Sequence, residues 1–278
     1  MPELPEVEVT KQGVEPHVIG KTVTSVAIYD GRLRWPVPAN LKKLLLGKKL
    51  TQIKRRGKYL LFRMEDGYLL IHLGMTGVLR VANPKDEIKK HDRVEIGFGK
   101  KLLRLHDPRK FGAVLWAPDE DGEIECHPLI AKLGVEPFSD DFSDEKAGPH
   151  LFEHAKGRQI AIKQWLLAGQ AVVGVGNIYC SESLFLAGIH PEMPAGKLSK
   201  ARASMLASAI KDTLSRAIKA GGSTLKDFVN SDGNPGHFML QTKVYDRFGL
   251  PCVKCKTPIK QIVQGQRSTY FCSKCQKK

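Results

Sequence analysis

Four cysteines near the end of the chain constrain its fold more than any other feature. They form two C-x2-C pairs separated by sixteen residues: Cys252, Cys255, Cys272 and Cys275. Each pair can place two sulfurs on one side of a tetrahedron while the intervening residues form a hairpin, so the spacing predicts one structural Zn²⁺. Disulfides are the alternative, and a reducing cytosol would disfavour them. Cys126 and Cys180 are isolated and are expected to be free thiols.

The chain carries a large positive charge. Its 278 residues include 44 Lys and Arg against 29 Asp and Glu, a formal net charge of +15. Solubility does not require such an excess, so a polyanionic partner is favoured over a basic protein without one. No segment resembles a membrane span or a charged-then-apolar leader, so we expect a cytoplasmic protein with no membrane partner.

Short strand-like segments fill the first half of the chain. Val, Ile, Leu and aromatic residues dominate residues 22–29, 59–64, 68–72, 93–98 and 113–116, with Gly, Asp and Asn between them. This pattern predicts an antiparallel β-sandwich, flanked by helices near residues 7–14 and 39–46. The second half shows helical spacing of apolar residues at 160–167 and 200–219. The predicted fold class is therefore α+β and multidomain.

The composition also suggests domain boundaries. The stretch from about residue 117 to 144 is acidic and contains several prolines, which indicates a linker. We predict a β-sandwich domain at residues 1–130, a linker at 131–145, a helical domain at 146–240 and a zinc finger at 241–278.

The first residues of the chain could form a nucleophile. Removal of Met1, which a small second residue usually permits, would leave Pro2 with a free secondary amine. An α-amino group titrates near pH ~8, so part of it is unprotonated and can form a Schiff base with a carbonyl-type carbon. Glu3 beside it could transfer protons. A simple helix start is the alternative, since Pro5 suits a first turn, and the two interpretations are compatible.

The string PELPEVE at residues 2–8 resembles the opening of the formamidopyrimidine-DNA glycosylases, bifunctional enzymes that excise oxidised purines and cut the DNA strand. The resemblance extends over nearly the whole chain. The segment at residues 172–191 is similar to the helix–two-turn–helix element of this family. The resemblance implies damaged double-stranded DNA as partner, one structural zinc and no small-molecule cofactor. A monomer is the default expectation.

The resemblance implies four catalytic residues. Pro2 would attack the sugar, Glu3 would move protons on the opened sugar, Lys58 would contact DNA and assist proton transfer, and Arg267 would engage phosphates and support the last elimination. From the residues alone, Lys58 belongs to a basic turn that could contact phosphates, and Arg267 is one of many surface arginines.

The resemblance also implies a wedge that fills the gap left by an extruded nucleotide. Met75 lies in a glycine-rich turn, and Arg109 and Phe111 lie in the segment DPRKFG. Apolar wedges unstack a base step, and arginine can hydrogen-bond the abandoned base. A Met and a Phe in the protein core are the alternative. Many relatives have a second arginine where Lys110 stands.

Four further residues are implied to contact DNA. His91 matches a DNA-contacting position, Asn177 would bind backbone phosphate, Arg158 is a basic position, and Lys163 would lie closer to the lesion pocket. A helix cap at Asn177 and solvated charges elsewhere are the alternatives.

The segment at residues 231–238 could form a lid over the everted base. The matching loop of the family senses the oxidised purine, although many members have tyrosine or phenylalanine where His237 stands.

The expected function is base excision repair of 8-oxoguanine and formamidopyrimidines through a Pro2 Schiff base, followed by β,δ-elimination. Two alternatives remain. One is a sister glycosylase of the endonuclease VIII type, which favours oxidised pyrimidines, and the other is a catalytically silent zinc-ribbon DNA-binding protein.

Overall fold

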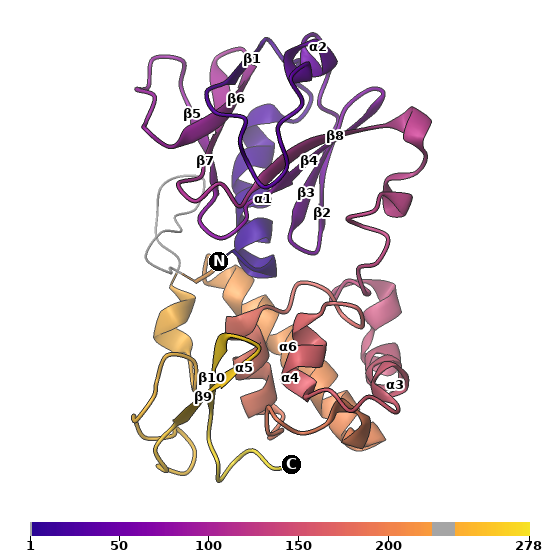
Figure 1. Cartoon of the computed structure of the whole chain (residues 1–278), viewed down its shortest axis with the longest axis vertical. Helices are drawn as coiled ribbons and strands as arrows, with labels where there is room; N and C mark the ends of the chain where they lie inside the picture. Colours follow the sequence, from indigo (N-terminus) through magenta and orange to yellow (C-terminus); the bar gives the residue numbers. More distant parts are fainter. Residues whose placement is uncertain (1, 224–236) are drawn as a thin grey trace. The chain divides into compact units, whose positions relative to one another are not determined.

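The computed structural model describes residues 2–223 and 237–278, which form two compact units (Figure 1). The first contains Met1–Ala131 and Ala220–His237, and the second contains Lys132–Lys219 and Phe238–Lys278. The chain passes between units after Ala131, at the start of the expected linker. Among the described residues, 220–223 and His237 group with the first unit, whereas the sequence placed them in the helical domain.

Two four-stranded antiparallel sheets build the described part of the first unit. The first sheet has the order β1 (Ser25–Ile28), β6 (Asp92–Phe98), β7 (Lys101–His106), β5 (Val78–Ala82). The second sheet has the order β2 (Gln52–Arg56), β3 (Tyr59–Arg63), β4 (Gly67–His72), β8 (Ala113–Pro118). One apolar core takes side chains from strands of both sheets, among them Phe62, Ile71, Ile96 and Leu105. The antiparallel sandwich within an α+β chain is therefore confirmed.

Three strands of the sandwich were missed by the sequence analysis. β2 is an edge strand, and only Ile53 of its QIKRR sequence is fully buried. β5 is the other sheet's edge, with a mixed burial pattern. β7 is central, but its apolar run is interrupted by Arg104, which is buried and paired with Glu95 of β6. In a sequence, a charged residue that is buried in an ion pair cannot be distinguished from one exposed on the surface.

Helix α1 (Leu4–Val18) runs beside strands of both sheets (Figure 1). Its buried face includes Leu4, Val7, Val14 and Val18. It begins three residues earlier than expected because Glu3 forms its N-terminal cap. The short helix α2 (Leu41–Leu45) covers part of the same core.

In the described residues of the second unit, four α-helices accompany a hairpin: α3 (Asp144–Ala155), α4 (Ile162–Leu167), α5 (Asn177–Leu186), α6 (Lys200–Lys219), β9 (Lys260–Gln264) and β10 (Arg267–Phe271). The expected limits of α6 agree with the structure, whereas α3 was not expected. A separate apolar cluster that includes Phe185, Val244 and Ile259 joins α5 to the hairpin and its cysteines.

Within the described ranges, no helix is long and apolar enough to cross a membrane. The expected lid at residues 231–238 lies outside the described residues, except for His237 and Phe238.

Candidate active site and nucleic-acid interface

The chain start is fixed by two carboxylates. Pro2 and Glu3 are buried immediately before α1. The Glu3 side chain accepts the N–H of Glu6, and Glu6 Oε2 accepts the N–H of Glu3 at 2.8 Å. Glu6 Oε1 also accepts the N–H and O–H of Ser223 at 2.7 and 2.9 Å. This reciprocal cap satisfies the first N–H groups of the helix and fixes the backbone that leads to Pro2.

Lys58 lies in the turn between β2 and β3. The two arginines that precede this turn, Arg55 and Arg56, belong to β2. Arg55 Nε donates to Glu8 Oε2 of α1 at 2.8 Å, and its Nη1 donates to the Gly57 carbonyl at 3.3 Å. One arginine therefore ties the Lys58 turn to the first half of α1.

His72, at the end of β4, is a residue that the sequence analysis did not single out as a site residue. Its ring lies 4.8 Å from that of Tyr59, its partner on β3. Burial, together with the charges of Lys58 and Arg34, lowers the pKa of His72 from 6.5 to about 4. Its Nδ1 accepts the N–H of Gly74 at 3.0 Å, so the neutral ring carries its proton on Nε2. The sequence contains little indication that His72 belongs to the site, because only the fold brings it near Lys58.

The three expected wedge residues are on two adjoining loops and not in the core. Met75 is 38% exposed on the β4–β5 turn, and Phe111 is 43% exposed on the β7–β8 loop. The Arg109 guanidinium lies 4.9 Å from the centre of the Phe111 ring. Gly74 has a φ of +64°, and a Cβ there would lie 2.3 Å from the Phe111 carbonyl carbon. The loops are therefore in direct backbone contact.

Lys110 points back onto its own unit. It adopts a φ of +60°, and its Nζ lies 2.7 Å from Asp30 Oδ2. Lys110 therefore forms an ion pair within its own unit.

His91 is partly buried just before β6. Its Nδ1 lies 3.2 Å from the Arg93 guanidinium, which can only donate. Partial burial and then the Arg93 charge lower the pKa of His91. The ring is therefore neutral with its proton on Nε2, which makes Nε2 a hydrogen-bond donor.

Asn177 and Lys163 both bind the hairpin strand next to Arg267. Asn177 is the first residue of α5, where Gly176 is the N-cap, and its Nδ2 donates to the Ser268 carbonyl at 3.0 Å. Lys163 is fully buried, and its Nζ donates to the same carbonyl at 3.0 Å and to Thr269 Oγ1 at 2.6 Å. In this structure the Lys163 ammonium faces the hairpin, and its expected contact with DNA stays a prediction.

Arg267 is exposed at the start of β10. Gly265 and Gln266 before it have φ values of +52° and +60°, which are typical of a type I′ two-residue hairpin turn. Arg158 is exposed on the loop between α3 and α4, where it lines a pocket of about 470 Å³ together with His154 and Lys156. Both arginines are accessible to a partner.

The four cysteines fit a zinc ion. Their sulfurs all lie within 4.8 Å of one another, with Cys252–Cys275 at 3.9 Å and Cys255–Cys272 at 3.4 Å. Tetrahedral Zn²⁺ with bonds of about 2.3 Å separates its sulfurs by about 3.8 Å. Four thiolates fill the coordination shell, so such an ion is structural.

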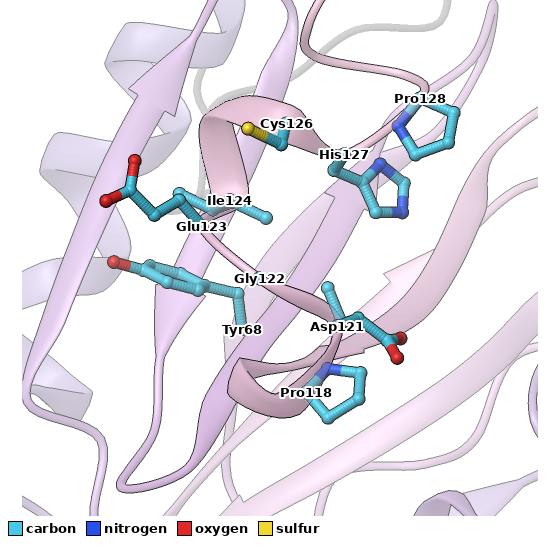
Figure 2. Close-up of a pocket in the computed structure, with 10 residues that line it drawn as sticks. Tyr68, Pro118, Asp121, Gly122, Glu123, Ile124, Cys126, His127 and Pro128 are labelled. Carbon is cyan, nitrogen blue, oxygen red and sulfur yellow. The ribbon is translucent and has the colours of Figure 1, made fainter.

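A pocket of about 390 Å³ lies where β4 and β8 meet the following chain (Figure 2). It is lined by residues that include Tyr68, Asp121, Glu123 and His127. None of the expected site residues lines it, so it is separate from the candidate active site.

Three family models match the chain in order. The formamidopyrimidine-DNA glycosylase N-terminal domain matches residues 1–114, the H2TH domain of the same enzyme matches 133–229, and the zinc finger found in FPG and IleRS matches 249–278. A formamidopyrimidine-DNA glycosylase of Polynucleobacter necessarius is 66% identical over 278 residues, with both chains fully covered. The chain belongs to the formamidopyrimidine-DNA glycosylase family.

This glycosylase is also similar to solved structures. MutM (FPG) of Thermus thermophilus has a TM-score of 0.87 and 38% identity, with 99% of this chain and 98% of that chain covered. A mutant of the Lactococcus lactis FPG, in complex with Fapy-dG containing DNA, has a TM-score of 0.86 and 33% identity, with both chains fully covered.

Family membership confirms the function expected from the sequence. The chain is a base-excision repair glycosylase for oxidised purines, with abasic-site lyase activity, and damaged DNA is its partner. The zinc finger model and the cysteine cluster confirm the expected structural zinc. Neither the pyrimidine-directed sister enzyme nor the silent DNA-binding protein is favoured.

Proposed function

We propose that the glycosylase acts through the amine of Pro2, once Met1 has been removed. The Pro2 nitrogen bonds to the anomeric carbon of the flipped nucleotide as the oxidised base leaves. The observation that supports this step is the fixed chain start, where Glu3 and Glu6 cap α1 reciprocally. A nucleophile held in one position loses little entropy on reaching the sugar.

Glu3, Lys58 and Arg267 are the other proposed catalytic residues. Glu3 transfers protons on the opened sugar, since it is the neighbour of the nucleophile and belongs to the same rigid cap. The iminium makes adjacent sugar protons acidic, so β- and then δ-elimination release the two flanking phosphates. Lys58 and Arg267 assist through charge and proton transfer. Arg55 supports the place of Lys58, because it ties that turn to α1.

DNA binding is assigned to side chains of both units. Met75, Arg109 and Phe111 fill the gap in the duplex, His91 donates from Nε2 to phosphate, and Arg158 adds a cationic contact. Asn177 remains a proposed phosphate ligand in addition to its bond with Ser268. The net charge of +15 favours binding that weakens as salt rises.

We place this enzyme in the bacterial cytoplasm as a monomer. Its relatives include the formamidopyrimidine-DNA glycosylases of the bacteria Polynucleobacter necessarius and Paraburkholderia phytofirmans.

Borohydride trapping tests the mechanism. The enzyme is mixed with duplexes that contain either an oxidised purine or an oxidised pyrimidine, reduced, digested and analysed by mass spectrometry. We expect a purine-selective adduct on Pro2. Pro2→Gly, which keeps a free terminal amine, should still crosslink but more slowly. An adduct on any other residue would refute the proposed nucleophile, and pyrimidine-selective trapping would support the sister activity.

A further inference from the structure

A buried carboxylate joins the two loops that carry the wedge residues. Asp107 is fully buried at the start of the β7–β8 loop. Its Oδ1 accepts the hydroxyl of Thr76 from the β4–β5 turn at 2.9 Å, and its Oδ2 accepts the N–H of Gly112 at 2.8 Å. Burial of a carboxylate is unfavourable unless its oxygens are hydrogen-bonded, so Asp107 fixes both loops at once.

The loops also leave no space for independent movement. A Cβ on Gly74 would lie 2.3 to 2.5 Å from backbone atoms of Phe111 and Gly112, and a Cβ on Gly112 would lie 2.9 Å from the His72 carbonyl oxygen. The Thr76 hydroxyl also lies 3.4 Å from the N–H of Arg109, which donates to it. Backbone contact and the carboxylate therefore hold the same two segments together.

A second layer supports the loop from behind. Arg93 Nε donates to the Asp107 carbonyl at 2.9 Å, and Arg93 Nη1 donates to Asp30 Oδ2 at 3.2 Å. Lys110 Nζ reaches the same oxygen at 2.7 Å. The backbone on each side of Arg109 is thus anchored to the sandwich.

We propose that Thr76 and Asp107 are positioning residues that make Met75, Arg109 and Phe111 one rigid wedge. Unstacking a base step costs a few kcal/mol. Two loops that moved independently would be displaced by the DNA before the base step unstacked. Thr76 directly follows Met75, and Asp107 lies two residues before Arg109, so their bond sets the spacing of the wedge. This inference rests on the proposed function, since it assigns the wedge its role in opening DNA.

The test compares Thr76→Val with Thr76→Ser. Valine keeps the shape of the side chain but removes the hydroxyl, whereas serine keeps the hydroxyl. Thr51→Val is the matched control, because the exposed Thr51 hydroxyl, just before β2 and outside the wedge, donates to the Arg63 carbonyl at 3.2 Å. Single-turnover excision is measured on duplex with an oxidised purine. Strand cleavage is measured on a single-stranded oligonucleotide with a preformed abasic site, which has no partner base to abandon.

We expect Thr76→Val to slow duplex excision by about 10-fold or more, while its cleavage of the single strand stays near that of the unaltered enzyme. Thr76→Ser and Thr51→Val should match the unaltered enzyme on both substrates. A 2-aminopurine next to the lesion should show slower unstacking only with Thr76→Val. Equal losses on both substrates, or no loss on either, would overturn the positioning role. Pro2 trapping by the unaltered enzyme is scored separately, so a failure of the catalytic proposal would be recognised as such.

Discussion

The imidazole of His72 is kept neutral by its surroundings. Because its pKa is lowered to about 4 in the folded chain, the unfolded chain binds a proton between pH 4 and 6.5 that the folded chain does not. The stability that this neutral ring contributes is complete above pH 6.5 and is lost as the pH falls toward 4. The loss should be about 1–3 kcal/mol.

His72→Asn tests this dependence on pH. The Asn oxygen can accept the Gly74 N–H in place of Nδ1, but the amide does not titrate. Thermal unfolding measured from about pH 4.5 to about pH 7.5 should vary less with pH in the variant than in the unaltered protein. If the variant and the unaltered protein showed the same dependence of thermal unfolding on pH, groups other than His72 would cause the loss of stability in acid.

The contacts of Lys163 indicate that it holds in place the hairpin that carries Arg267. Lys163→Met removes two hydrogen bonds that hold Ser268 and Thr269, so Arg267 should shift and excision should fall by about 10-fold or more. If the buried ammonium acts only by holding the hairpin, the dependence of DNA affinity on salt should keep its slope. Lys146→Met, which removes an exposed lysine of the same unit, is the control for charge. A shallower salt dependence for Lys163→Met alone would restore the direct contact that the sequence suggested.

The two wedge loops make an element whose fit can be tested with glycine substitutions. Gly74→Ala combines a φ of +64° with a backbone clash, whereas Gly47→Ala has a φ of +81° and no atom within 4 Å of its Cβ. The control should lose about 1 kcal/mol of unfolding free energy from backbone strain alone, and Gly74→Ala should lose about 2–4 kcal/mol. Urea unfolding of both variants measures the difference. Equal losses would show that the loops separate easily.

The sequence predicted the elements whose burial repeats regularly. Helix α6 shows apolar residues at helical spacing, and β6 is a run of strand-forming residues, so their locations were clear. Strand β7 was missed because Arg104 interrupts it, and its Glu95 partner lies on a neighbouring strand. Only tertiary structure shows that this charge is paired.

The sequence suggested candidate site residues one by one, but not the contacts between them. Resemblance pointed to Lys163 and Asn177, yet they meet Ser268 across separations of 105 and 91 residues. Nothing local in the sequence indicates such a convergence. The Thr76–Asp107 bond, which spans 31 residues, was missed for the same reason.

At the scale of the whole molecule, the sandwich and the zinc module have separate apolar cores. The core of the sandwich contains residues of the first unit only, and the cluster at the zinc module contains residues of the second unit only. Stability that derives from the metal should therefore be confined to the second unit. This separation makes the effect of metal removal specific enough to measure.

Chelation of zinc should disorder the hairpin that carries Arg267 while the sandwich stays folded. Of the three tryptophans, Trp35 and Trp116 lie in the first unit and Trp165 lies in the second. In a Trp165→Phe variant, fluorescence reports the sandwich alone, and its urea midpoint should be the same with and without a chelator. DNA affinity should fall on chelation and return with added Zn²⁺, because the hairpin refolds only around the metal. If the fluorescence midpoint fell together with DNA affinity, the two cores would be coupled and the zinc would stabilise the whole chain.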